Sequence, residues 1–306
     1  MKIVFNLHSV GLGNNGGSKT LVRCAESLAL LGHEVVMYSN VESRFSWHNP
    51  IGVKMKGGKR PPASDIAIAT GYKSVDSTVS SDASKKFYYI RGFELWQAKE
   101  KHLIASYKKL NCIVNSGWLK DYLEARGIPV KLIWAGMDFD RYYNLNEYRP
   151  DIVGGLFHKK HKTKRHSHVQ QIAENAGYDL KMLGKDCKNP SLKKLNNFFN
   201  SIKVWIATTE LEGFHNPPTE TSLAGAGLVA TDHPMSGMSD YVIDEETALV
   251  YKSNNLDQAS ENVKRLMNDN NLRIKLNNNM VDLLKNKIGS REDNMKKMVE
   301  YFNESK

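Results

Sequence analysis

The chain has 306 residues, of which 41% are hydrophobic, so it can bury two ordinary domain cores and is not an intrinsically disordered chain. Three widely spaced cysteines exclude a disulfide framework, and no apolar run has the length of a signal peptide or a membrane span, so we expect a cytoplasmic protein. The first 150 residues hold 21 Lys/Arg against 13 Asp/Glu, a net charge of +8, which favours an anionic partner or peripheral contact with a membrane.

In the first half of the chain, short apolar runs alternate with amphipathic segments. Their length and their β-branched or aromatic content predict buried parallel strands at 2–7, 33–39, 65–70, 85–90, 111–116 and 130–136. Helical spacing predicts helices at 19–31, 93–109 and 117–127. Residues 40–64 have weak periodicity and a Pro61-Pro62 pair, and we expect an irregular loop there.

The second half repeats this alternation. It predicts strands at 151–157, 178–184, 202–208, 227–232 and 247–252, and helices near 165–176, 191–200, 217–226 and 256–287. Continuous alternation predicts an α/β protein with two doubly wound, Rossmann-like domains. The polar, turn-rich segment 140–152 places the boundary between domains at 1–146 and 147–288, followed by a last amphipathic helix in 289–306.

A glycine-rich stretch follows the first predicted strand. Gly11-Leu12-Gly13-Asn14-Asn15-Gly16 spells a dinucleotide fingerprint, but the second strand ends at Asn40 without the acidic residue that would bind a ribose. A P-loop needs a glycine before Lys19, where this chain has Ser18. What remains is a helix N-terminus whose N–H groups suit phosphate or sugar oxygens.

Four histidines and five basic residues are interleaved between 158 and 168. Because neighbouring lysines repel a divalent cation, a phosphate site fits this segment better than a metal site. The segment also opens a helix within an α/β unit and has few aromatic neighbours, so nucleic-acid binding is the weaker interpretation. The members of this group are His158, Lys159, Lys160, His161, Lys162, Lys164, Arg165, His166 and His168.

The most informative segment is 207–251, in which seven residues separate Glu212 from Glu220. Asn216 is expected to cap a helix that opens with Pro217-Pro218, which places Glu212 in the preceding loop and Glu220 about one turn into the helix. Both carboxylates can then point into the crevice at the carboxyl ends of parallel strands, where open α/β sheets bind ligands. The alternative is that Glu220 is only a first-turn acid favoured by the helix dipole.

This segment resembles the retaining glycosyltransferases of family 4, which have the GT-B fold. The family pattern is Glu-Gly-Phe-Gly, a second glutamate, and then Val-Ala-Thr, and Glu212-Gly213-Phe214, Glu220 and Val229-Ala230-Thr231 match it without gaps. Upstream, 153–177 resembles the first strand, loop and helix of the family's second domain. The chain departs from the family in having His215 for a glycine and Arg91 near the place of a histidine.

The resemblance implies two Rossmann-like domains that face each other across a cleft, with the nucleotide-diphosphate sugar on the second. Lys159 and Lys164 would hold the diphosphate, and Glu220 would accept hydrogen bonds from the ribose. Glu212 would orient the transferred sugar together with backbone N–H groups of the loop that precedes the helix. The residues of that loop are Phe214, His215 and Asn216.

On the first, acceptor-binding domain, the resemblance implies that Gly16 and Gly17 let the backbone approach the donor phosphate and the acceptor, and that Arg91 lies near the reacting carbon. The expected reaction is sugar transfer with retention to a glycan or lipid-linked acceptor, without a metal or a tightly bound cofactor and without a nucleic-acid partner. Two alternatives stay open: a non-catalytic protein that binds nucleotide sugars or glycans, and a GT-B nucleotide-sugar epimerase.

Overall fold

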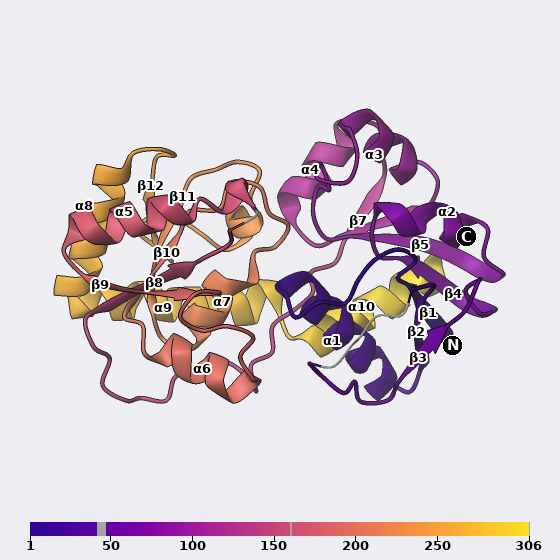
Figure 1. Cartoon of the computed structure of the whole chain (residues 1–306), viewed down its shortest axis with the longest axis horizontal. Helices are drawn as coiled ribbons and strands as arrows, with labels where there is room; N and C mark the ends of the chain where they lie inside the picture. The colour runs from indigo at the N-terminus through magenta and orange to yellow at the C-terminus, as the bar shows by residue number, and fades with distance from the viewer. Residues whose placement is uncertain (42–46, 160, 306) are drawn as a thin grey trace. The chain divides into compact units, whose positions relative to one another are not determined.

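The computed structural model describes residues 1–41, 47–159 and 161–305. The chain forms two compact units, one made of residues 1–136 and 290–306 and the other of residues 137–289 (Figure 1). Each unit is built on a sheet in which every pair of neighbouring strands is parallel, with helices packed on it. Lys160 of the basic segment and part of the expected loop at 40–64 lie outside the described residues.

The first unit has a seven-stranded sheet in the order β3-β2-β1-β4-β5-β6-β7. Its strands are β1 (Lys2–Asn6), β2 (Glu34–Ser39), β3 (Val53–Gly57), β4 (Ser64–Ala69), β5 (Ala83–Ile90), β6 (Asn111–Val114) and β7 (Val130–Leu132). Its helices are α1 (Gly16–Leu30), η1 (Tyr72–Ser74), α2 (Val75–Val79), α3 (Glu100–Tyr107), α4 (Gly117–Glu124) and α10 (Arg291–Glu304).

The expectation of an irregular loop throughout 40–64 was wrong, because β3 pairs in parallel with β2 inside it. The strand is at the edge of the sheet and mostly exposed, and its sequence Val-Lys-Met-Lys-Gly lacks the apolar run that marks a buried strand. The helix expected at 93–109 is also shorter, because only α3 at 100–107 is helical.

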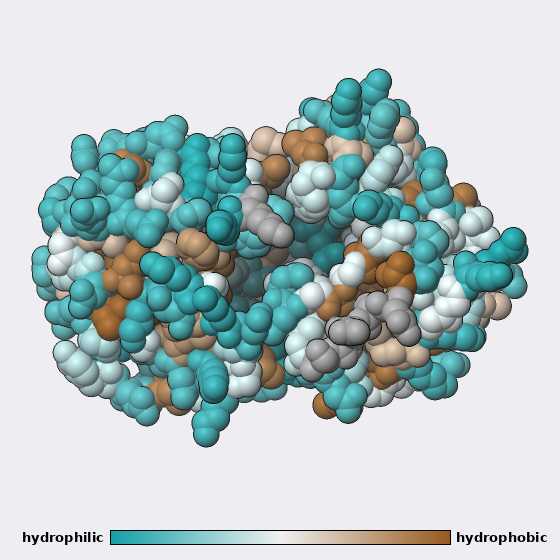
Figure 2. Space-filling view, in the orientation of Figure 1, coloured by the Kyte–Doolittle hydropathy of each residue, from teal (hydrophilic) through white to brown (hydrophobic). Residues whose placement is uncertain are grey.

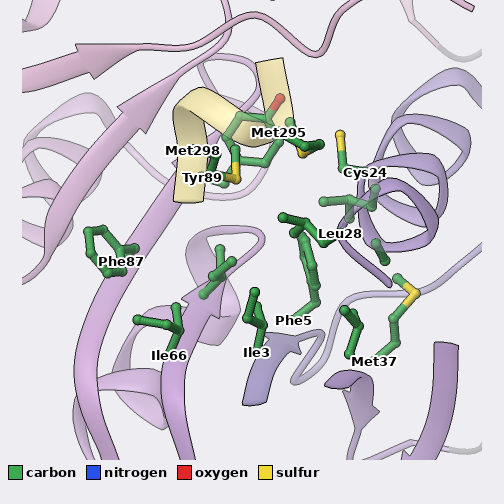
Figure 3. Packing of buried hydrophobic residues seen from close by; sticks show 14 of the residues in the cluster. Ile3, Phe5, Cys24, Leu28, Met37, Ile66, Phe87, Tyr89, Met295 and Met298 are labelled. Atoms are coloured by element: carbon green, nitrogen blue, oxygen red, sulfur yellow. The ribbon is translucent and has the colours of Figure 1, made fainter. Parts of the chain in front are cut away.

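The core of the first unit joins the two ends of the chain. Ile3 and Phe5 of β1 pack with residues of α1 and with Met295 and Met298 of α10, all fully buried (Figure 3). The ring of Phe302, further along α10, lies 4.7 Å from the ring of Phe87 on β5. The last helix is therefore part of this unit's hydrophobic core.

The second unit has a five-stranded sheet in the order β12-β11-β10-β8-β9. Its strands are β8 (Ile152–Leu156), β9 (Asp179–Leu183), β10 (Val204–Ala207), β11 (Gly227–Thr231) and β12 (Leu249–Tyr251). Its helical segments are η2 (Lys162–Lys164), α5 (His166–Ala176), α6 (Leu192–Asn200), α7 (Asn216–Leu223), η3 (Gly237–Asp240), α8 (Leu256–Asn268), α9 (Asn270–Leu283) and η4 (Leu284–Ile288).

Two boundaries in this unit differ from those expected. The helix expected at 256–287 is divided at Asp269, whose carboxylate caps α9 by accepting a hydrogen bond of 2.9 Å from the backbone N–H of Leu272. The units divide after Gly136 instead of after residue 146, because the intervening residues pack on the second unit. The ring of Tyr142, for example, lies 5.9 Å from that of Phe199.

The strand orders define where each sheet is expected to bind ligands. In a doubly wound sheet the crevice forms at the carboxyl ends of the two central strands from which the chain winds in opposite directions. These strands are β1 and β4 in the first unit and β8 and β10 in the second. No helix in the described part of the chain is long and apolar enough to span a membrane. The face drawn in Figure 2 is mainly hydrophilic, with hydrophobic residues in small separate groups.

Candidate active site

An ion pair lies at the carboxyl ends of β8 and β10 in the second unit. Lys164 ends the short helix η2, which follows β8, and its ammonium group contacts the carboxylate of Glu212 in the loop after β10. The two side chains are 16% and 27% exposed, so both are shielded but reachable from solvent. Burial lowers the pKa of Lys164 to about 8.

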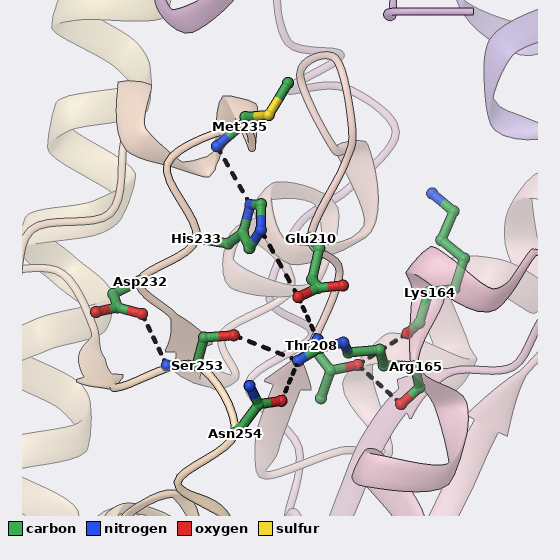
Figure 4. Close-up of polar contacts among 9 residues, drawn as sticks. All are labelled: Lys164, Arg165, Thr208, Glu210, Asp232, His233, Met235, Ser253 and Asn254. Atoms are coloured by element: carbon green, nitrogen blue, oxygen red, sulfur yellow. Dashed lines mark hydrogen bonds and ion pairs between the residues drawn. The ribbon is translucent and has the colours of Figure 1, made fainter. Parts of the chain in front are cut away.

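Hydrogen bonds fix the backbone beneath this ion pair. The hydroxyl of Thr208, directly after β10, donates to the carbonyls of Lys164 (2.9 Å) and Arg165 (3.2 Å) (Figure 4). The backbone N–H of Glu210 donates to the carbonyl of Thr163 at 3.0 Å. These bonds join the two loops that carry Lys164 and Glu212 and so fix the backbone on both sides of the ion pair.

A second, separate ion pair supports the same loops. Arg165 contacts the carboxylate of Glu210 and donates to the side-chain oxygen of Asn254 at 2.8 Å, while Nε2 of His233 lies 3.6 Å from the Glu210 carboxylate. In Figure 4 the Lys164 side chain points away from this group. In the sequence Arg165 is only one of many basic residues, because nothing there identifies Glu210 or His233 as its neighbours.

The expected loop of backbone N–H donors lies where α7 begins. The helix starts at Asn216, so His215 occupies the cap position, and the expectation that Asn216 is the cap was wrong by one residue. His215 has φ +60°, in the left-handed region that favours glycine, which accounts for the glycine in the family pattern. The hydroxyl of Tyr241 donates to the His215 carbonyl at 2.9 Å and holds this conformation.

The side chain of His215 is buried beside the ion pair. Its Nε2 lies 3.4 Å from the hydroxyl of Thr209, and its Nδ1 has no hydrogen-bond partner among the described residues. Burial, together with the charge of Lys164, lowers the pKa of His215 well below its ordinary value. The imidazole is therefore neutral at physiological pH.

The loops after β10 and β11 are in close backbone contact. The N–H of Glu212 donates to the carbonyl of Met235, and the N–H of Gly237 donates to the carbonyl of Glu212, both at 3.3 Å. A Cβ at position 237 would collide with the carbonyl of Gly213, so only glycine fits there. The ring of Phe214 is buried, 5.3 Å from that of Tyr241.

Two further residues of the predicted site lie on the same segments. Glu220 is the fifth residue of α7 and is partly buried, as expected for a carboxylate about one turn into the helix. Lys159 is exposed in the loop between β8 and η2. His158 and His161 of that loop stack edge to face with ring centroids 4.3 Å apart. In the described part of the chain, no three His, Cys, Asp or Glu residues are grouped so that they could hold a metal ion.

The first unit brings together Gly17 and Arg91, two residues that the sequence singled out. The Arg91 guanidinium donates to the carbonyl of Gly17 at 2.7 Å and to the carbonyl of Thr70 at 2.8 Å. Gly16 and Gly17 begin α1, which Asn15 caps by accepting from the N–H of Ser18 at 3.0 Å. Arg91 thus ties the glycine-rich loop to the end of β4.

Two parallel-sheet units with these strand orders define the protein as having the GT-B fold, which solved structures of little sequence identity share. Sucrose-phosphate synthase from Thermosynechococcus elongatus superimposes with a TM-score of 0.80 over 99% of this chain and 98% of that one, at 14% identity. HepE from Anabaena, solved with UDP and glucose, superimposes with a TM-score of 0.80 over the full length of both chains, at 11% identity.

Sequence comparison finds similarity to glycosyltransferases over part of the chain. Residues 146–281 match the family described as "Glycosyl transferases group 1". The capsular polysaccharide biosynthesis glycosyltransferase CapM of Staphylococcus aureus is 27% identical over 94 residues, which cover 31% of this chain and 24% of CapM. The Lys164–Glu212 pair lies within the family match, which covers less than half of the chain.

Proposed function

We propose that this protein is a retaining glycosyltransferase of family 4 that transfers a sugar from a nucleotide-diphosphate sugar to a glycan or lipid-linked acceptor. The observation that carries the proposal is the Lys164–Glu212 ion pair at the carboxyl ends of β8 and β10, inside the segment that matches group 1 glycosyl transferases. A cation beside a carboxylate can bind an anionic diphosphate and a polyhydroxylated sugar side by side.

Four site residues of the second unit have a proposed role in donor binding. Lys164, with the exposed Lys159, neutralises the diphosphate, and Glu220 accepts hydrogen bonds from the ribose. Glu212 accepts hydrogen bonds from the hydroxyls of the transferred sugar and orients it. Because a diphosphate competes with Glu212 for the ammonium of Lys164, donor binding would release the carboxylate to the sugar.

The chemistry then needs orientation and charge stabilisation more than a strong base. The C–O bond between the sugar and the diphosphate breaks, the acceptor hydroxyl attacks on the same face, and the leaving phosphate oxygen takes its proton. Lys164 stabilises the charge that develops on the leaving group. No metal and no tightly bound cofactor takes part in this scheme. His215, which is neutral, packs behind the loop and transfers no proton.

The first unit is proposed to bind the acceptor. Gly16 and Gly17 allow close approach to their backbone, and Arg91 holds that backbone in place through the Gly17 carbonyl. The basic first half of the chain is proposed to favour an anionic or membrane-borne acceptor met at the cytoplasmic surface of a membrane.

A thermal-shift panel of nucleoside diphosphates and their sugars tests the proposal. A ligand at a hundred times its dissociation constant adds about 2.7 kcal/mol of stability, which raises the melting temperature measurably. We expect at least one nucleotide sugar to stabilise the native chain and to lose this effect in Lys164→Ala. Stabilisation by none of them would contradict donor binding, and conversion of the donor without an acceptor would identify an epimerase instead.

A further inference from the structure

One edge of the first unit's sheet carries lysines that share a face. In the parallel register of β2 and β3, Val36 pairs with Lys54 and Tyr38 pairs with Lys56. Paired residues of neighbouring strands point to the same face of a sheet, so both lysines lie on the face that holds the buried side chains of Val36 and Tyr38. Together with Lys2, which begins β1, they line a groove of about 410 Å³.

The cations at this groove outnumber the carboxylates. Lys54 forms an ion pair of 3.1 Å with Glu34, and the Asp65 carboxylate accepts a hydrogen bond of 2.7 Å from the backbone N–H of Lys2. Residues 58–62 follow β3 and lie along the groove, which the last of them lines. Four cations at or beside the groove form no ion pair among the described residues, and these are Lys2, Lys56, Lys59 and Arg60.

Exposed apolar side chains lie along the same edge of the sheet. Met55, between the two lysines of β3, is 42% exposed, and Ile51, in the turn before the strand, is 62% exposed. A Cβ at Gly52 would lie 3.1 Å from the Cβ of Ala29, so this turn abuts the end of α1, where Leu30 is 76% exposed. The edge therefore combines a cationic groove with an exposed apolar rim.

We propose that this edge, made of Lys2, Leu30 and residues 51–60 and called the docking edge below, binds an anionic phospholipid bilayer. The negative potential of such a surface attracts lysine and arginine, and apolar side chains beside them enter the head-group boundary. A soluble polyanion would use the cations but leave the three apolar side chains in water. Three such side chains also fall far short of the area of a stable protein interface.

The docking edge is separate from the acceptor site proposed above. Lys2 and Glu34 begin β1 and β2, so the groove lies at the amino ends of these strands, whereas Arg91 follows the carboxyl end of β5. Bilayer binding through this edge therefore does not depend on which acceptor the chain uses. The proposed function needs a membrane only where the acceptor is membrane-borne, and the inference goes beyond it by assigning a bilayer contact to named residues.

Co-sedimentation of the full chain with vesicles tests the docking edge. We expect binding to vesicles of phosphatidylcholine and phosphatidylglycerol in equal parts, far weaker binding to phosphatidylcholine alone, and loss of binding as the salt concentration rises. Each lysine at an anionic surface contributes about fivefold to the partition coefficient, so Lys56→Gln with Lys59→Gln should bind roughly 25-fold more weakly. Lys193→Gln with Lys194→Gln removes the same charge from exposed positions on α6 of the second unit and should bind like the native chain.

The apolar rim is tested in the same way. Ile51→Ser should weaken vesicle binding about tenfold, because the side chain that enters the head-group boundary is lost. Ile274→Ser, at a position of α9 in the second unit that is 49% exposed, should have no effect. Equal binding by the two double lysine variants would overturn the inference, as would binding of soluble polyphosphate without binding of vesicles.

Thermal shift with a nucleotide sugar separates the docking edge from the proposed function. All four variants are expected to keep the donor-induced shift of the native chain, because none of the substitutions lies in the donor site. A donor-induced shift in a native chain that binds no vesicles would contradict the docking edge alone. Vesicle binding by a native chain that no nucleotide sugar stabilises would contradict the proposed function alone.

Discussion

At the scale of single residues, Lys164 is the group expected to matter most for transfer. Removal of one group that stabilises transition-state charge costs about 3–4 kcal/mol of barrier. We expect Lys164→Ala to slow glycosyl transfer by roughly a hundredfold or more. Lys203→Ala is the control, because Lys203 pairs with Asp151 at the amino ends of β10 and β8, opposite to the carboxyl ends that carry Lys164 and Glu212. Turnover within a factor of two of the native rate would remove Lys164 from the mechanism.

The lowered pKa of Lys164, about 8, predicts how donor affinity changes with pH. Below pH 8 the free site holds an ammonium ion, and above pH 8 it loses the charge that binds the diphosphate. Calorimetric titration with a nucleotide sugar should therefore show weaker binding as the pH rises from 7 to 9. Lys164→Arg keeps its charge over this range, so its affinity should be flat. An equal decline in both proteins would assign the effect to another group.

His215 provides a separate test on stability. Its pKa is lowered well below the ordinary value in the folded protein, so the unfolded chain binds more protons below about pH 6.5. Stability should fall as the pH is lowered through that range, by up to about 1.4 kcal/mol per pH unit for this one group. Asparagine tolerates a positive φ, so His215→Asn should keep the backbone conformation. Its free energy of unfolding, measured by urea denaturation at several pH values, should depend less on pH than that of the native chain. The same dependence of the unfolding free energy on pH in both proteins would mean that the imidazole is protonated in the folded state as readily as in the unfolded chain.

For single residues, the sequence carries information only where the pattern is local. It singled out Lys164 and Glu212, and the structure brings them into contact. It did not find the Arg165–Glu210–His233 group, since a contact across many residues of sequence leaves no local signal. It also misplaced the cap of α7, because a histidine with a positive φ is an uncommon substitute for glycine or asparagine.

At the scale of elements, the contact between the loops after β10 and β11 depends on Gly237. A methyl group there would push against the Gly213 carbonyl and separate the loop that carries Glu212 from its support. We expect Gly237→Ala to lower the free energy of unfolding by about 3 kcal/mol and to abolish donor binding. Gly11→Ala, at a position with open space around it, should have little effect on either. Native-like donor affinity in Gly237→Ala would contradict the proposed geometry.

Helices and strands were predicted best where burial requires a clear pattern of apolar residues. All of the strands expected in the second half are present. The central strands β8, β10 and β11 are largely buried and read as apolar runs, and the edge strands β9 and β12 also carry apolar residues. The edge strand β3 was missed because its lysines face solvent, and the division of 256–287 was missed because a single capping aspartate interrupts an otherwise helical pattern.

At the scale of the whole molecule, the last helix ties the end of the chain to the first unit. Phe302 is fully buried against Phe87 on β5, so Phe302→Ala should cost about 3–5 kcal/mol. Hydrogen exchange followed by mass spectrometry should show faster exchange in β5 and unchanged exchange in β8 and β10 of the other unit. Phe302→Leu, which keeps most of the apolar volume, should exchange more like the native chain. Equal loss of protection in both units would argue against separate cores.

A crystal structure with a nucleoside diphosphate bound would show whether the second unit holds the diphosphate of a nucleotide sugar. We expect phosphate oxygens within hydrogen-bonding distance of Lys164 Nζ, at the carboxyl ends of β8 and β10, with the ribose near Glu220. A diphosphate bound instead only at the glycine-rich start of α1, with Lys164 still paired to Glu212, would contradict this expectation.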